Sequence, residues 1–122
     1  MIHLKDRILG ELEQIAGADI SDSYPEDFST ETQIQYTEEE NKADQMAGNK
    51  VAASRVRYRI DIWDKRSTSA LAGMVDDRLN GNLGLTRTHC SDSNEPGRKH
   101  KIMRYEGIVY EKDGRVVSPP GY

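Results

Sequence analysis

The stretch of sequence that decides the fold is RVRYRIDIW, residues 55–63, in which apolar and polar side chains alternate. The apolar positions are Val56, Tyr58, Ile60 and Ile62. The positions between them carry Arg57, Arg59, Asp61 and Trp63. A period of two places these two sets on opposite faces of an extended strand. Residues 55–63 are therefore predicted to form a half-buried β-strand.

The flanking segments predict two helices and three further strands. Apolar residues recur at helical spacing in residues 2–16 and again in residues 67–79. Alternation predicts strands at residues 32–39, 83–90 and 99–111, the last two joined by a turn at Pro96-Gly97, whereas the polar residues 41–50 are predicted to form a long mobile loop. The expected fold class is α+β, order α-β-β-α-β-β, with two helices packed on one face of a mainly antiparallel four-stranded sheet.

The length of 122 residues predicts one domain, assigned to residues 1–112, followed by an extended tail at residues 113–122. Apolar runs are too short to span a bilayer, and the N-terminus lacks the order of a signal peptide, so no membrane partner is expected. The chain is expected to be made in a cytoplasm. A single cysteine, Cys90, rules out an intrachain disulfide and a multi-cysteine zinc site.

Charge is distributed unevenly along the chain. Residues 1–49 contain 12 acidic and 3 basic residues, whereas residues 50–122 contain 9 acidic and 14 basic residues. This split has three interpretations: ordinary solvated charge, an acidic surface of one copy that meets a basic surface of the next in a head-to-tail ring, or contact with nucleic acid. The pI near 5.4 makes nucleic acid the weakest of the three.

The basic face of the central strand is the candidate site. Arg55, Arg57 and Arg59 would form a positive stripe, because alternate residues of a strand share one face. Arginine is favoured at interfaces since its planar fork binds carboxylates through two hydrogen bonds. We predict a subunit or partner interface, with a solvated face and nucleic acid as alternatives, comprising Glu38, Glu39, Glu40, Arg55, Arg57, Arg59, Trp63 and Arg104.

The last predicted strand adds to this interface prediction. It carries apolar residues on both faces, with Ile102, Ile108 and Tyr110 on the second one. A strand that is apolar on both sides is typical of burial on both sides. The second face is therefore predicted to be covered by a partner subunit.

Patterns that would indicate an enzyme or a metal site are weak. His89, Cys90, Asp92 and His100 are the only cluster of metal-ligand residue types, and their spacing fits no zinc pattern. Paired carboxylates such as Asp76-Asp77 are typical of surface charge, and nucleotide-binding and hydrolase motifs are missing. We predict no catalytic residues, no metal and no cofactor.

Three stretches resemble a known family. They are YRIDIWD at residues 58–64, the predicted helix at Ser67–Leu79, and KIMRYEGI at residues 101–108, with Tyr24-Pro25 as an earlier aromatic–proline step. In this order they resemble the small tail-terminator or tail-completion proteins of long-tailed bacteriophages and prophages. The resemblance covers residues 2–110.

The resemblance implies an α+β structural protein of the virion tail that is not an enzyme. Its subunits would form a ring, expected to be hexameric, that caps the tail-tube protein at the head-proximal end and joins it to a head-side connector protein. Nucleic acid would only pass through the ring. A head–tail adaptor or connector stopper has similar size and polarity and is the first alternative; a small nucleic-acid-binding module is the second.

Overall fold

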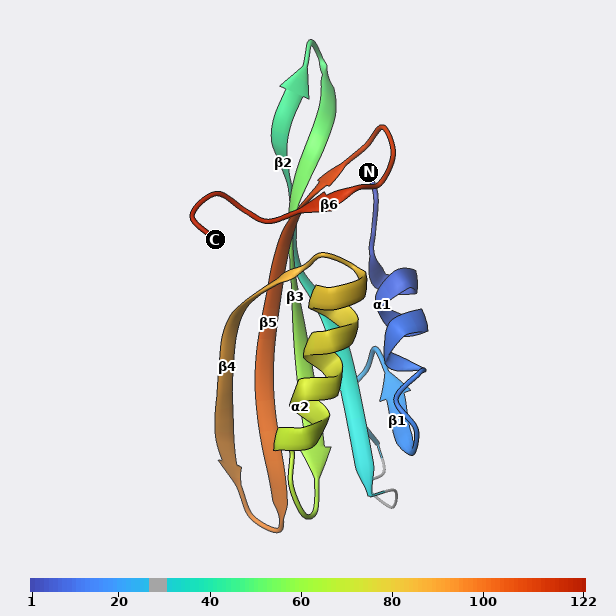
Figure 1. Cartoon of the computed structure of the whole chain (residues 1–122), viewed down its shortest axis with the longest axis vertical. Helices are drawn as coiled ribbons and strands as arrows, with labels where there is room; N and C mark the ends of the chain where they lie inside the picture. The colour runs from blue at the N-terminus through green and yellow to red at the C-terminus, as the bar shows by residue number, and fades with distance from the viewer. Residues whose placement is uncertain (27–30) are drawn as a thin grey trace.

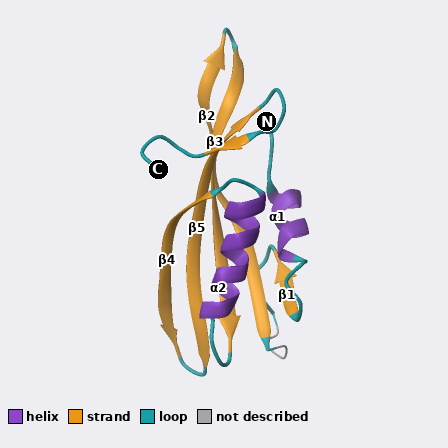
Figure 2. Cartoon of the chain, viewed as in Figure 1, coloured by secondary structure: helices purple, strands orange, loops and turns teal. Residues whose placement is uncertain are grey.

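The computed structural model describes residues 1–26 and 31–122 (Figure 1). Two α-helices, a π-helical turn and six strands follow one another along the chain. They are α1 Lys5–Leu12, β1 Ala18–Ser21, β2 Thr32–Ala47, β3 Lys50–Asp64, α2 Ser69–Asp76, η1 Asp77–Asn82, β4 Thr86–Glu95, β5 Arg98–Tyr110 and β6 Val116–Val117. Strands make up about half of the chain (Figure 2).

The six strands form one mixed sheet. Its order is β1-β2-β3-β5-β4, with β6 paired to β5. β1 runs parallel to β2, and the other neighbours are antiparallel. The predicted α+β order α-β-β-α-β-β and its four-stranded sheet are therefore wrong, because the order is α-β-β-β-α-β-β-β. Both added strands are short, four residues in β1 and two in β6, and so carry too little alternation to be recognised.

The strand predicted at residues 55–63 is confirmed within β3, which lies in the middle of the sheet. The hairpin predicted across Pro96-Gly97 is also confirmed, since Glu95 pairs with Arg98 and Gly97 has a φ of +79°. Such a positive φ at the residue after proline is what a type II turn requires. β4 and β5 therefore stand side by side in the register that the turn sets.

Both helices lie over one face of the sheet (Figure 1), and the core forms between them and the strands. Tyr58 and Tyr105 are register partners on β3 and β5 at the centre of this core, and both are fully buried. Tyr58 Oη accepts a hydrogen bond from the backbone N–H of Leu4 at 2.9 Å, and Tyr105 donates to Asp76 at 2.8 Å. The two hydroxyls thereby tie the start of the chain and the end of α2 to the sheet.

The long loop predicted at residues 41–50 is instead a β-hairpin. β2 continues to Ala47, β3 begins at Lys50, and only Gly48 and Asn49 form the turn between them. The prediction was wrong because asparagine, lysine and aspartate are uncommon in strands and the segment does not alternate. The hairpin projects beyond the rest of the sheet at the top of Figure 1.

The predicted tail at residues 113–122 folds back on the sheet. Val116 and Val117 of β6 pair with Val109 and Ile108 of β5. A Cβ on Gly107 would lie 2.9 Å from Val116 and 3.0 Å from Leu85, so glycine is what allows this close approach. In the described part of the chain, no helix is long and apolar enough to cross a membrane.

Candidate interaction surface

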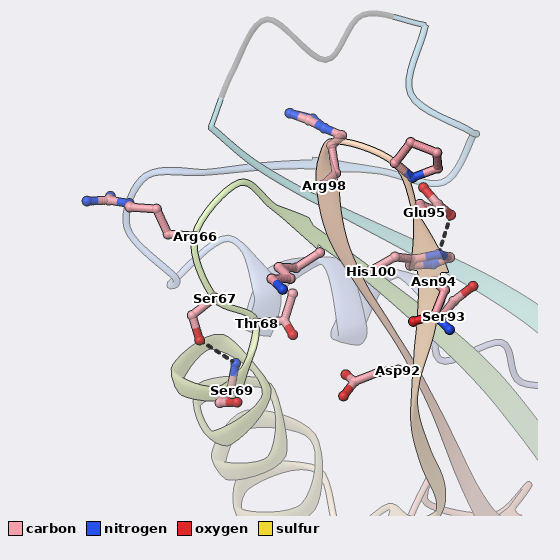
Figure 3. Close-up of a pocket in the computed structure, with 12 residues that line it drawn as sticks. Arg66, Ser67, Thr68, Ser69, Asp92, Ser93, Asn94, Glu95, Arg98 and His100 are labelled. Carbon is pink, nitrogen blue, oxygen red and sulfur yellow. Dashed lines mark hydrogen bonds and ion pairs between the residues drawn. The ribbon is translucent and has the colours of Figure 1, made fainter.

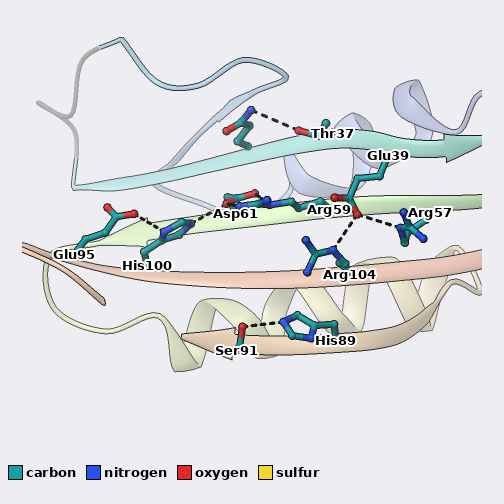
Figure 4. Close-up of polar contacts among 11 residues, drawn as sticks. Thr37, Glu39, Arg57, Arg59, Asp61, His89, Ser91, Glu95, His100 and Arg104 are labelled. Atoms are coloured by element: carbon teal, nitrogen blue, oxygen red, sulfur yellow. Dashed lines mark hydrogen bonds and ion pairs between the residues drawn. The ribbon is translucent and has the colours of Figure 1, made fainter. Parts of the chain in front are cut away.

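The side of the sheet that faces away from the helices is the candidate interaction surface, and we call it the open face (Figure 4). It is formed by alternate residues of β2, β3, β5 and β4. Antiparallel sheets commonly leave one face solvated in this way. Its polar residues include Thr37 and Glu39 from β2, Arg57, Arg59 and Asp61 from β3, His100 and Arg104 from β5, and His89, Ser91 and Glu95 from β4.

Glu39 joins arginines from two strands. Its Oε1 accepts hydrogen bonds from Nε of Arg57 at 3.2 Å and from Nε of Arg104 at 3.0 Å. Arg57 also lies 3.5 Å from Glu40. The register shifts between Glu38 and Glu40, so Glu39 is the extra residue of a β-bulge. The bulge gives Arg57 two carboxylates, because both bulge residues face it.

Asp61 is a second centre of ion pairs on the open face. Arg59 donates two hydrogen bonds to its carboxylate, at 2.8 and 2.9 Å. His100 lies between two carboxylates, with Nε2 at 2.8 Å from Asp61 and Nδ1 at 2.6 Å from Glu95. The hydrogen bonds to Asp61 raise the pKa of Arg59 above its ordinary value. Asp61 is 4% exposed, so Arg59 supplies the charge compensation that a buried carboxylate needs, and His100 adds a further hydrogen bond.

Trp63 lies beside this cluster and is covered. Its ring stacks on His100, with centroids 4.5 Å apart, and Tyr24 meets it edge-on at 5.6 Å. Only 1% of Trp63 is exposed. Tyr24 follows β1, so this residue lies against the end of the open face. Trp63 therefore belongs to a buried aromatic contact and is not presented to a partner in this structure.

Glu38 lies on the opposite side of the sheet from Glu39. Its carboxylate accepts a hydrogen bond from the Tyr58 hydroxyl at 2.7 Å and further ones from His3 and Asn41. Burial alone would raise the pKa of Glu38, but these hydrogen bonds outweigh burial and lower it. Burial and the contact with Glu38 together raise the pKa of Tyr58. Glu38 thus stabilises the helix side and is separate from the arginine face.

The arginines predicted to meet a neighbour pair with carboxylates of their own chain. Arg55 lies 3.3 Å from Glu106, Arg57 and Arg104 share Glu39, and Arg59 holds Asp61. Glu39 of the acidic half of the sequence thus neutralises arginines of the basic half within one molecule, whereas Asp61 and Glu106 belong to the basic half themselves. The arginines still keep roughly a third of their side-chain surface exposed, from 29 to 37%. Their role in an interface stays a prediction.

Sequence reasoning missed the roles of Glu95 and His100. The contact between Glu95 and His100 could have been predicted from the Pro96-Gly97 turn. A two-residue turn makes Ser93 and His100 register partners, which brings Glu95 diagonally close to His100. The contact of His100 with Asp61 could not be found that way. It depends on β5 pairing with β3, which is a crossover past α2 and β4.

The four residues considered as metal ligands do not converge. His89 bonds to Ser91, Asp92 binds Lys101 at 2.7 Å, and His100 binds Asp61 and Glu95. Cys90 is exposed and unpaired. Across residues 1–26 and 31–122, no group of three or more His, Cys, Asp or Glu residues is arranged to hold a metal ion.

A hollow of about 580 Å³ lies between the start of α2 and the end of the β4–β5 hairpin (Figure 3). Asp64 fixes its rim by accepting hydrogen bonds from the Thr32 hydroxyl at 2.6 Å and from the backbone N–H groups of Arg66 and Ser67. Burial raises the pKa of Asp64, but these hydrogen bonds outweigh it and the pKa is lowered. The hollow is lined by charged and hydroxyl side chains and is open to solvent, so it lacks the enclosed apolar walls of a typical small-molecule site.

Neither a scan against models of known protein families nor a search of curated proteins gave a match for this chain.

Proposed function

We propose that this protein is a structural subunit of a bacteriophage tail: a tail terminator that forms a ring, expected to be a hexamer, at the head-proximal end of the tail tube. The ring would join the tail-tube protein to the head-side connector protein. The subunit would be made in the bacterial cytoplasm and end in the virion tail. The proposal rests on the resemblance of residues 58–64 and 101–108 to that family and on the character of the open face.

The open face is the observation that best supports an assembly role. Four arginines are fixed by carboxylates at 2.8–3.3 Å and remain partly exposed. A charged side chain that is already held in place loses less conformational entropy on binding than a mobile one. Such a surface suits the polar part of a protein–protein interface. A subunit of a ring contacts a neighbour on each of two sides, so it needs more than one protein-binding surface.

An enzymatic role is less well supported by the same residues. His100, the one buried histidine, has both ring nitrogens within 2.8 Å of carboxylates. A general base needs a ring nitrogen that can reach a substrate proton. We therefore assign the Asp61–His100–Glu95 contacts to structure and not to catalysis.

The nucleic-acid alternative has less support than it had from the sequence. A protein binds phosphate backbones through cations that replace counterions. Here Glu39, Glu40, Asp61 and Glu106 already neutralise the arginine stripe. A mobility shift at low salt measures the remaining affinity, and a shift that falls steeply with salt would favour this alternative.

Binding to tail-tube ends tests the proposal directly. The purified protein is mixed with assembled tail-tube protein and with the head-side connector, and bound material is imaged by electron microscopy. Rings at tube ends are the expected result. Binding to the connector alone would assign the adaptor or stopper role, and binding to neither would refute the proposal.

A matched set of variants separates assembly from folding. Arg57→Glu with Arg104→Glu reverses two partly exposed arginines that share Glu39, and spares Arg59 because its partner Asp61 is buried. A third change, Glu39→Arg, restores opposite charges within the chain. If the arginines bind a partner, the triple variant regains stability but not assembly. Recovery of both would show that the arginines serve only the fold.

A further inference from the structure

The end of the β2–β3 hairpin is an exposed projection, which we call the arm and define as residues 44–51. Within the described chain, the pairs Met46–Val51 and Ala47–Lys50 have no third strand beside them, whereas Ala53 still pairs with Tyr110 of β5. At the usual rise per residue the arm extends about 13 Å. A two-stranded hairpin is only marginally stable alone in water. Packing against another surface would stabilise the arm.

The arm presents an apolar pair at its end. Met46 and Val51 are cross-strand partners, so their side chains share a face, and they are 57% and 37% exposed. Ala47 and Lys50 form the next pair toward the turn. Two exposed apolar side chains that lie side by side offer area that a partner can remove from water.

A matching groove lies on the helix layer, between the end of α1 and the helix formed by α2 and η1. It has a volume of about 580 Å³ and is lined by Gln14, Ile15, Ala16, Met74, Asp77, Arg78 and Asn82. Met74 is 51% exposed, although it lies on a helix whose other side is in the core. The groove therefore offers exposed apolar surface where most helices of this kind present polar residues.

Charge complements the apolar match. Lys50 on the arm and Asp77 in the groove are both exposed. Neither has an ion-pair partner within residues 1–26 and 31–122. Arg78, the other charge in the groove, is held by Glu11 at 3.6 Å. With Met46 seated against Met74, an ion pair between Lys50 and Asp77 would neutralise both.

We propose that the arm of one copy docks into the α1–α2 groove of the next copy. The arm cannot reach its own groove because it points away from the helices (Figure 1), so the contact joins two molecules. It uses different surfaces on the two copies, and such head-to-tail contacts produce a closed ring when the rotation between copies closes, and an open filament when it does not. The inference deepens the proposed ring assembly and rests on it, by naming the contact that links neighbouring subunits.

Mixing two variants tests the inference. Met46→Asp disables the arm and leaves the groove intact, whereas Met74→Asp disables the groove and leaves the arm intact. Both residues are exposed, so each variant should fold, which thermal unfolding checks. Native mass spectrometry should show that each variant alone is monomeric, with association weakened at least about thirtyfold, as for an interface anchor. The 1:1 mixture should give a dimer and nothing larger, because only one intact contact is available. Lys112→Asp, an exposed change outside both surfaces, should assemble like the unaltered protein.

The possible outcomes separate this inference from the function. If the unaltered protein forms rings on tube ends and both variants still do, the arm–groove contact is refuted and the ring proposal stands. A mixture that stays monomeric under conditions in which the unaltered protein associates also refutes the contact. If the unaltered protein never associates, even at tube ends, the proposed function fails and the inference fails with it.

A disulfide trap gives a readout that does not depend on weakening the assembly. Cys90 is exposed and is first replaced by serine. Met46→Cys and Met74→Cys are then combined in one chain and oxidised under assembly conditions. A ladder of covalent oligomers is expected if the two positions meet between copies, because a disulfide needs Cα atoms within about 7 Å. Monomers alone would refute the contact.

Discussion

On the helix side of β3, Tyr58 and Ile60 are fully buried among apolar side chains, whereas on the open side Arg57 and Arg59 keep about a third of their surface exposed. The helix side is stabilised by removal of apolar area from water, which is large and non-directional. The open side is held by ion pairs, which contribute little to stability at an exposed position. One strand thus serves the fold on one face, and we propose that it serves recognition on the other.

The largest effect on stability should come from the helix side. Tyr58→Ala removes a fully buried ring and two hydrogen bonds, so we expect a loss of about 3–5 kcal/mol in the free energy of unfolding. Urea titration followed by circular dichroism measures it. Tyr58→Phe is the matched control and should cost about 1–3 kcal/mol, since only the hydroxyl is lost. A loss below about 1 kcal/mol for Tyr58→Ala would remove the distinction between the faces.

The next effect concerns the buried carboxylate of the open face. Asp61→Ala leaves Arg59 and His100 without their shared partner, so we expect a loss of about 1–3 kcal/mol. Thr37→Ala, on the same face but outside the ion pairs, should change stability by less than about 0.5 kcal/mol. If Asp61→Ala cost as much as Tyr58→Ala, the open face would be a second core and not a recognition surface.

Acid should weaken the fold through two carboxylates. The pKa values of Glu38 and Asp64 are lowered in the folded protein, so the unfolded chain binds protons at a higher pH than the folded one. Their contribution is fully present above the unfolded values, about 4 for both residue types, and is lost as the pH falls through the lower folded values. Unfolding curves between pH 7 and pH 3 measure this slope. Glu38→Gln and Asp64→Asn should each flatten it, and an unchanged slope in both variants would contradict the assignment.

The smallest effect on stability is expected for the exposed arginines. Arg57→Gln with Arg104→Gln should cost about 0–1 kcal/mol, because exposed ion pairs are weak. The same double variant should lose assembly on tube ends if the open face is an interface. Light scattering and urea titration on one sample compare the two quantities. A stable, fully assembling variant would show that recognition lies elsewhere, for example on the arm.

Several elements could be predicted because their signal is local. The alternation in residues 55–63 predicts β3, and proline followed by glycine predicts the turn before β5. The arm and β6 could not be predicted in this way. Residues 41–47 lack strand-forming side chains and extend β2 only because they pair with β3. The two residues of β6 are too few to show a period, and they form a strand only because they pair with β5.

The candidate site also has one part that the sequence predicts and one part that depends on the tertiary structure. Sequence alone placed Arg55, Arg57 and Arg59 on one face, because side chains of a strand alternate by geometry. Only the tertiary structure brought Glu39 to Arg57 and Arg104, and Asp61 to His100, since these contacts join residues 18, 65 and 39 positions apart. Alternation along β2 places Glu38 on the helix side, and the bulge at Glu39 keeps Glu40 beside Arg57 on the open face, so three consecutive glutamates form two groups with different roles. The alternation of β3 was therefore determined by the sequence of that strand, whereas the partners of its side chains were decided by strand pairing across the sheet.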